Sequence, residues 1–158
     1  MRKQKGFSLI ELLIVVAIIL IIAAIAIPNL IRSRIAANEA SAVGSLRTLN
    51  TSEITYNATY PQSGFTCTLA NLGGSGANAA PSASGAGLID NNLMSGQKSG
   101  YSFNITACAS AGSIVVTYST DAAPQVQYQT GNRYFCSNQS GVIMFSGSGY
   151  VAGCTNTL

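Results

Sequence analysis

The sequence predicts an α+β fold in which a long N-terminal helix packs on a C-terminal antiparallel sheet of about four strands. An apolar run occupies residues 7–27 of the 158-residue chain, and helical periodicity continues beyond it as far as residue 60. The last third instead consists of short runs of β-branched and aromatic residues separated by turn formers. Helices repeat every 3.6 residues and strands every two, so the change of period divides the chain into a helical part and a sheet part.

Residues 7–27 predict a helix that spans a membrane. At a rise of 1.5 Å per residue this run makes about 31 Å of helix, which matches the hydrocarbon core of roughly 30 Å. Arg2, Lys3 and Lys5 precede the run, so its N-terminal side is expected to stay in the cytoplasm while the rest is exported. Pro28 follows directly and removes a backbone donor, which makes it a candidate point for a kink.

Residues 28–60 predict an amphipathic continuation of this helix. Steps of three, four and seven place its apolar residues on one stripe, which comprises Ile31, Ile35, Ala42, Leu46, Leu49 and Tyr56. The charged residues are expected to lie mostly off the stripe, namely Arg32, Arg34, Glu39, Arg47 and Glu53. Tyr60-Pro61 is the predicted stop, because the residue before a proline is disfavoured in the helical region.

Residues 61–100 predict a connecting region between helix and sheet. Residues 73–87 contain only Gly, Ala, Ser, Asn and Pro, which predicts an exposed loop without a binding role. Before it, residues 69–74 read LANLGG and suggest a short helix that ends at a glycine.

Residues 101–158 predict the antiparallel sheet and a C-terminal region. Five short runs have strand composition: 101–107, 113–120, 126–130, 133–137 and 142–146. The connections are short, as hairpins require. One face of the sheet is expected to cover the helix stripe, which gives a two-layer head.

The charge distribution argues against nucleic-acid binding. The chain has 8 Lys+Arg and 5 Asp+Glu, and Arg2, Lys3 and Lys5 account for the excess. The remaining chain therefore lacks the basic face that nucleic acids require. Only 8% of residues are charged, against a typical value of about 25%. A surface this neutral suits packing against copies of the same chain.

The sequence also argues against an enzyme. The chain has no His, and its acids are scattered at Glu11, Glu39, Glu53, Asp90 and Asp121. General acid-base or nucleophilic chemistry normally needs a His, a carboxylate pair or an activated Cys or Lys. We therefore expect no catalytic residue, no metal site and no cofactor.

Four cysteines beyond the apolar run predict two disulfides in an oxidising compartment. None lies in a CxxC or Cys/His metal spacing, and four cysteines permit three pairings. The segment between Cys136 and Cys154 is short and turn-rich enough to fold back. This favours a Cys136–Cys154 pair and leaves Cys67 with Cys108.

Glu11 is the one charged residue in the apolar run. A charged side chain deep in a bilayer costs about 2.5–3.5 kcal/mol on insertion scales, so an intramembrane acid usually has a role.

Two simple interpretations of the N-terminus leave Glu11 unexplained. One is a removable signal with Ala24-Ile25-Ala26 as its cleavage site. The other is a membrane-anchored, adhesin-like binding domain whose contacts come from Tyr101, Tyr118, Tyr128, Tyr134 and Tyr150.

A third interpretation accounts for Glu11. The stretch Gly6-Phe7-Ser8-Leu9-Ile10-Glu11 resembles the processing motif of type IV prepilins and type II secretion pseudopilins. The resemblance implies that residues 1–6 are a leader, that a prepilin peptidase cleaves after Gly6, and that its N-methyltransferase activity methylates Phe7. It also implies a pilin-like fold, in which Cys136 to Cys154 corresponds to a disulfide-bounded C-terminal region.

The implied function is that of a structural subunit of a type IV pilus. The subunit would enter the lipid bilayer of the inner membrane as a prepilin, and the pilus assembly machinery would polymerise it into an extracellular homopolymer. Glu11 would set the register by pairing with the new amine of another subunit, or with that of its own chain. Pro28 and Gly44 are candidate points at which the helix bends or melts on packing.

The alternative within the family is a pseudopilin of a type II secretion system. Major pseudopilins commonly carry a calcium site of clustered acids, whereas Asp90 and Asp121 stand alone here. Two disulfides and a nearly neutral head favour the extracellular pilus. The choice between a major and a minor subunit stays open, as do the roles of adhesion, motility, DNA uptake and electron transfer.

Overall fold

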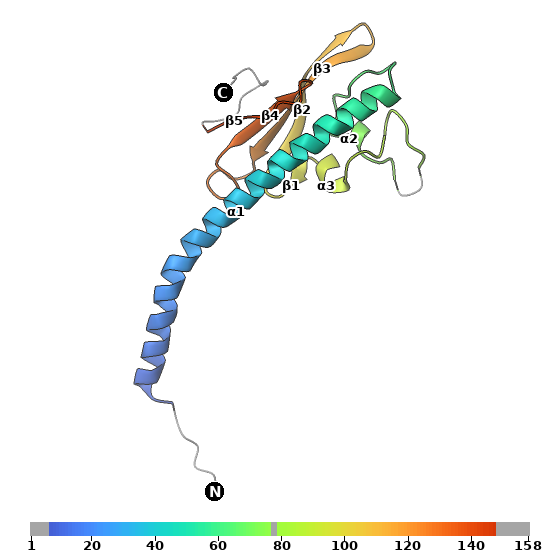
Figure 1. Cartoon of the computed structure of the whole chain (residues 1–158). Coiled ribbons are helices and arrows are strands. Elements are labelled where there is room, and N and C mark those ends of the chain that lie inside the picture. Colours follow the sequence, from blue (N-terminus) through green and yellow to red (C-terminus); the bar gives the residue numbers. More distant parts are fainter. Residues whose placement is uncertain (1–6, 77–78, 148–158) are drawn as a thin grey trace. The chain divides into compact units, whose positions relative to one another are not determined.

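The computed structural model describes residues 7–76 and 79–147, which form part of two compact units, Met1–Arg34 and Ile35–Leu158. Helix α1 (Leu9–Thr59) starts in the first unit and ends in the second. The remaining elements all belong to the second unit (Figure 1). They are α2 (Leu69–Leu72), α3 (Asn91–Met94), β1 (Gln97–Lys98), β2 (Tyr101–Ala111), β3 (Ile114–Pro124), β4 (Tyr134–Asn138) and β5 (Met144–Ser146).

The first half of α1 is long and apolar enough to cross a membrane. Nearly all side chains of residues 7–34 are exposed, and the large ones among them are mostly Ile, Leu and Val. Pro28 lies within the helix and does not end it. An apolar helical surface of this size is stable in lipid or against other helices and unstable in water.

Helix α1 ends where the sequence predicts. Its last residue is Thr59, and the Tyr60 amide still donates to the Tyr56 carbonyl at 2.8 Å. Gly64 then donates to the Tyr60 carbonyl at 3.2 Å, which turns the chain back towards the sheet. The pyrrolidine ring of Pro61 accounts for the stop, since it disfavours helical backbone at the preceding residue.

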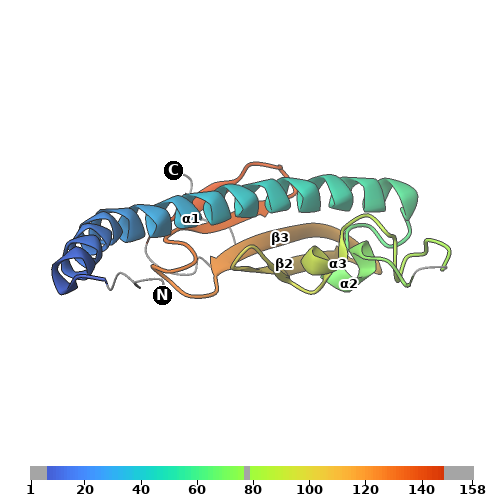
Figure 2. The same ribbon diagram turned by 90° about the horizontal axis from the view of Figure 1, so that it is seen from below.

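The sheet is antiparallel throughout and has five strands in the order β1-β2-β3-β4-β5. Figure 2 shows the second half of α1 running along the sheet, with β2 and β3 beneath it. The predicted α+β fold class is therefore confirmed. The strands β2 and β3 form a long hairpin with a register shift between Thr106 and Ala109.

The strand predicted at 126–130 was wrong. These residues form a turn, in which the amides of Gln129 and Thr130 both donate to the Val126 carbonyl. Tyr128 has a φ of 66°, which extended backbone does not permit. Four other runs became β2 to β5, and β1 is a two-residue strand that the sequence did not predict.

The region 61–100 contains more structure than a loop. The short helix predicted near LANLGG is present as α2, whereas α3 was not predicted. Asp90 caps α3 by accepting a hydrogen bond from the Leu93 amide at 3.0 Å. Ala86 belongs to the core, so the predicted exposed loop is partly buried at its end.

Residues 63–65 occupy part of one edge of β3. The Phe65 amide donates to the Val115 carbonyl and the Val115 amide donates to the Ser63 carbonyl, both at 3.0 Å. β4 pairs only with residues 119–122 of β3 and leaves this stretch uncovered. The segment after α1 thus supplies hydrogen-bond partners for an edge that would otherwise be open.

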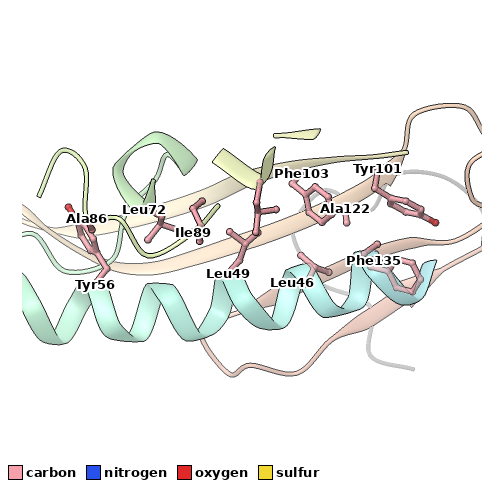
Figure 3. Close-up of a cluster of buried hydrophobic side chains, with 12 residues drawn as sticks. Leu46, Leu49, Tyr56, Leu72, Ala86, Ile89, Tyr101, Phe103, Ala122 and Phe135 are labelled. Carbon is pink, nitrogen blue, oxygen red and sulfur yellow. The ribbon is translucent and has the colours of Figure 1, made fainter. Parts of the chain in front are cut away.

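The core lies between the second half of α1, the sheet and the short helices (Figure 3). Leu46, Leu49 and Tyr56 come from α1, as the predicted stripe requires. Partners from the sheet and its connections are Leu72, Ala86, Ile89, Leu93, Tyr101, Phe103, Ala122 and Phe135. Ile31, at the other end of the predicted stripe, is exposed within the first unit.

The interface between α1 and the sheet is more polar than the sequence predicts. Glu39 and Glu53 were expected off the buried stripe, yet they are only 5% and 0% exposed. Both lie seven residues from Leu46, so they share its helix face. Asn50 also lies inside, where its amide donates to Ser137 Oγ at 2.7 Å and its carbonyl accepts from Tyr118 Oη at 3.3 Å.

Candidate assembly site

Glu11 lies in the first turn of α1 and caps the start of the helix. Its Oε2 accepts a hydrogen bond from the Ser8 amide at 2.9 Å. The Ser8 carbonyl accepts the first helical bond, from the Leu12 amide at 3.3 Å, so Ser8 occupies the N-cap position. Glu11 then stands at N3 and makes the glutamate half of a capping box. This arrangement satisfies one otherwise unpaired donor of the helix start.

The carboxylate of Glu11 is exposed and has no cation beside it in the described part of the chain. The two ion pairs among residues 7–76 and 79–147 join Lys98 with Asp90 and Arg133 with Glu39. The large apolar side chains that flank Glu11 in the sequence are exposed, and Phe7 is 83% exposed. A positive group from outside the described residues can therefore reach this carboxylate without displacing a salt bridge.

The structure places the other predicted site residues as follows. Phe7 precedes the N-cap and is exposed, whereas Gly6 lies outside the described residues. Cys67 and Cys108 form the predicted disulfide, which ties the segment after α1 to β2. Cys136 is buried on β4, and Cys154 lies outside the described residues, so their pairing stays a prediction.

A second feature fixes α1 on the sheet in the second unit. Glu39 Oε1 accepts hydrogen bonds from the backbone amides of Asn132 and Arg133 at 2.9 and 3.2 Å. Glu39 Oε2 accepts from Arg133 Nε at 2.7 Å and contacts the same guanidinium through Nη2 at 2.6 Å. Burial raises the pKa of Glu39, but these donors outweigh it and hold the pKa below its usual value.

We expect Glu39→Gln to lower the free energy of unfolding by about 1–2 kcal/mol at neutral pH. The substitution keeps the size of the side chain but removes the charge that Arg133 contacts, and Arg133 is exposed enough to be partly rehydrated. A carboxyl with a lowered pKa stabilises the fold when ionised. The difference in the free energy of unfolding between wild type and variant should therefore have its full size above pH 4.5 and disappear as the pH falls below it.

Urea denaturation of the full chain in detergent, followed by circular dichroism, measures this difference. Asp90→Asn is the matched control, because asparagine retains the cap on α3 and loses only an exposed pair with Lys98. An exposed pair contributes about 0.2–1 kcal/mol. Equal losses in the two variants would contradict the anchoring role of Glu39.

Sequence reasoning missed two buried contacts of α1, that of Glu39 with the residues before β4 and that of Glu53 with the segment after α1. The signal was present in the spacing, because Glu39, Leu46 and Glu53 recur every seven residues. Their charge made them look like surface residues, and the partners of Glu39 are far away in sequence. Asn132 and Arg133 are 93 and 94 residues from Glu39 and carry no pattern that links them to it.

Comparison with known proteins defines the class of the N-terminal segment. Residues 1–27 match the family model of the prokaryotic N-terminal methylation motif. The segment that carries Phe7 and the capped Glu11 therefore lies within this methylation motif. The predicted resemblance is confirmed for this segment.

The relatives found by sequence are type IV pilins. The chain is 64% identical over 39 residues to the type IV wide pilus major component PilA4 of Thermus thermophilus, covering 25% of this chain and 30% of that protein. It is 49% identical over 51 residues to the type IV major pilin protein PilA of Myxococcus xanthus, covering 32% of this chain and 23% of that protein. The matches thus span less than a third of either relative. No solved structure matches the chain.

Proposed function

We propose that this chain is a structural subunit of a type IV pilus and polymerises through its N-terminal helix. The observation that carries the proposal is a lone, exposed carboxylate on an exposed apolar helix, within a segment that matches the methylation motif. Two type IV pilins resemble the chain over 39 and 51 residues. An apolar helix with a single acid suits a fibre core better than a solitary anchor.

The mechanism follows from the chemistry of the helix start. Cleavage between Gly6 and Phe7 would create an α-amino group, whose pKa is about 7.7–8.0 in a flexible peptide. Methylation turns this primary amine into a secondary amine, which can still be protonated and carries more apolar surface. The amine of an incoming subunit would pair with Glu11 of a subunit already in the fibre. This pairing fixes the axial stagger between helices that otherwise slide freely on apolar side chains.

The capping bond explains how Glu11 is tolerated before assembly. Inside the membrane its carboxylate accepts from the Ser8 amide of its own chain, and it lies at the positive end of the helix dipole. Both effects offset part of the penalty of a charge in lipid. In this proposal assembly exchanges a weak local partner for a charged one on a neighbouring subunit.

The proposed partners and locations follow from the successive steps of processing and assembly. The prepilin would sit in the inner membrane with residues 1–6 in the cytoplasm and the head in the periplasm. A prepilin peptidase with N-methyltransferase activity would act at Gly6 and Phe7. The pilus assembly machinery would then move the subunit into a homopolymer outside the cell, in a structural and not an enzymatic role.

We expect Gly6→Leu to keep the chain at its precursor mass and out of surface fibres. A large side chain at the residue before the scissile bond blocks close approach of the peptidase backbone. The wild-type chain and the variant are each expressed with the peptidase, and the membrane and sheared surface fractions are compared by immunoblotting. Wild-type expression without the peptidase is the control and should give the same membrane-bound precursor.

The fraction that contains the processed chain separates the candidate functions. Processed chain in sheared fibres supports the pilus subunit. Processed chain that remains in periplasmic or membrane fractions, in cells that assemble pili from their own subunits, would contradict it in favour of a pseudopilin. An unprocessed wild-type chain in the presence of the peptidase would contradict both and leave an anchored domain.

A further inference from the structure

Glu53 is a buried carboxyl at the contact between α1 and the segment that follows it. Its side chain is 0% exposed. Oε2 accepts one hydrogen bond, from the Thr66 amide at 2.9 Å. Within residues 7–76 and 79–147, Oε1 is one of two buried side-chain atoms without a hydrogen-bond partner, the other being Thr120 Oγ1. A buried polar atom without a partner is destabilising and requires an explanation.

Among the described residues, no positively charged group compensates Glu53. The ionisable side chains that its charge affects are Tyr56 on α1 and Tyr118 on β3. On the segment that contacts it, Cys67 is held in a disulfide and does not titrate. Burial raises the pKa of Glu53 to about 7, and the Thr66 amide lowers it only in part. Burial also raises the pKa of Tyr118, to about 12, so this tyrosine is neutral wherever Glu53 titrates.

Glu39 provides a direct comparison on the same helix. Both carboxyls are buried, but Glu39 accepts from two backbone amides and a guanidinium whereas Glu53 accepts from one amide. One neutral donor does not replace the water that two carboxylate oxygens lose on burial. Glu39 is therefore suited to the ionised state and Glu53 to the protonated state.

A cavity of about 470 Å³ adjoins this position in the second unit. Its lining includes Tyr56, which precedes the end of α1 by one turn, and Thr66, the residue bonded to Glu53. Ser63 and Phe65 line it as well. The residues that cover Glu53 thus form a wall of an open, water-accessible space. A small outward shift of residues 63–66 would bring water to the carboxyl.

Backbone hydrogen bonds and a disulfide limit how far residues 63–66 can move. Residues 63 and 65 bond to Val115 through their backbone, and Cys67 is joined to Cys108. The Thr66–Glu53 bond lies between these two attachments and links the segment to α1. Loss of this bond would therefore loosen a short segment at the end of α1 and leave the rest of the head in place.

We propose that Glu53 is a proton-controlled latch, which holds residues 63–66 against α1 while protonated and releases them when it ionises. On ionisation the proton passes to water in the adjoining cavity, and the carboxylate draws water in as the segment shifts. On protonation the water leaves and the segment closes. This inference concerns the head alone and does not depend on assembly into a fibre.

The sign of the pH effect follows from the raised pKa. The closed state binds a proton more tightly than an open state in which Glu53 is hydrated, so acid favours closure. Protonated Glu53 stabilises the closed state fully below the ordinary pKa of 4.5, and this stabilisation is lost as the pH rises to about 7. Above that range Glu53 is ionised, and the equilibrium between the closed and the open state no longer changes with pH.

Hydrogen exchange of the full chain in detergent micelles, read by mass spectrometry, tests the latch. The exchange rate of peptides covering residues 60–68 is measured for wild type and for Glu53→Gln at each pH. The ratio of the two rates cancels the intrinsic pH dependence of exchange. Between about pH 5 and about pH 8.5 this ratio should rise on the order of 50-fold, because the glutamine cannot ionise. A ratio that does not change with pH would overturn the proposal.

Glu39→Gln is the matched control, and a titration keeps the test independent of any variant. Over the same pH range the ratio of wild type to Glu39→Gln should stay constant for residues 60–68, because Glu39 is ionised throughout. In the wild-type chain, carbon NMR of labelled glutamate carboxyls should show Glu53 titrating near neutral pH. A Glu53 that titrates below about pH 5 would overturn the latch even if Glu53→Gln failed to fold.

Discussion

Glu11→Gln should be processed normally but should not appear in surface fibres. Glutamine retains an oxygen that can accept from the Ser8 amide, so the cap on α1 survives. It removes the charge that the proposed amine partner requires. A hydrogen bond to a charged group contributes about 1.5–3 kcal/mol, which corresponds to roughly a 10- to 150-fold change in each contact. A fibre repeats this contact at every subunit, so the loss of binding free energy accumulates along the fibre.

Glu11→Ala separates the two roles of this residue. Alanine loses both the capping bond and the charge, whereas glutamine loses only the charge. If charge pairing drives assembly, immunoblots of sheared material should lack both variants while the membrane retains processed chain. If the cap alone matters, Glu11→Gln should assemble like wild type, and that outcome would contradict the pairing with the amine.

Gly64→Ala should destabilise the head by about 2–4 kcal/mol. Gly64 has a φ of 75°, in the left-handed region that side chains disfavour. A Cβ there would also collide with the Val115 carbonyl oxygen and the Ile114 side chain. Relief of the collision requires residues 63–65 to leave the edge of β3. Thermal unfolding of the full chain in detergent measures the loss.

Gly44→Ala is the control and should have the opposite sign. Gly44 is exposed on α1, its backbone is helical, and a Cβ there would meet no atom within 4 Å. Alanine in a helix interior is favoured over glycine by about 0.8–1.0 kcal/mol. A loss of stability at both positions, or at neither, would contradict this account of the Gly64 turn. Increased stability of Gly44→Ala would also show that the helix is locally weakened at Gly44.

Much of the fold could be predicted because local patterns determine it. The apolar stripe of Leu46, Leu49 and Tyr56 identified the buried face of α1, and Pro61 identified its end. The disulfide between Cys67 and Cys108 was predicted, although only as the pair left by a choice at the other two cysteines. Each of these features depends on residues that are close in sequence or on a small set of options.

The features that were missed depend on distant partners or on elements too short to have a period. α3 has four residues and β1 two, so neither shows a repeat. The buried role of Glu39 depends on Arg133, and that of Glu53 on the path of the chain after α1. At the candidate assembly site, the motif predicted the importance of Glu11. The capping bond from Ser8 was readable from the three-residue spacing but is not part of that prediction.

The N-terminal peptide of sheared fibres provides the most direct test of the central claim, that this chain is a processed fibre subunit. The material is purified from cells that express the full chain with a prepilin peptidase, and the peptide is analysed by mass spectrometry. The account predicts a peptide that begins at Phe7 and carries one methyl group on its amine. A peptide that begins at Ile27, or an uncleaved Met1 terminus with no chain in the sheared material, would contradict it.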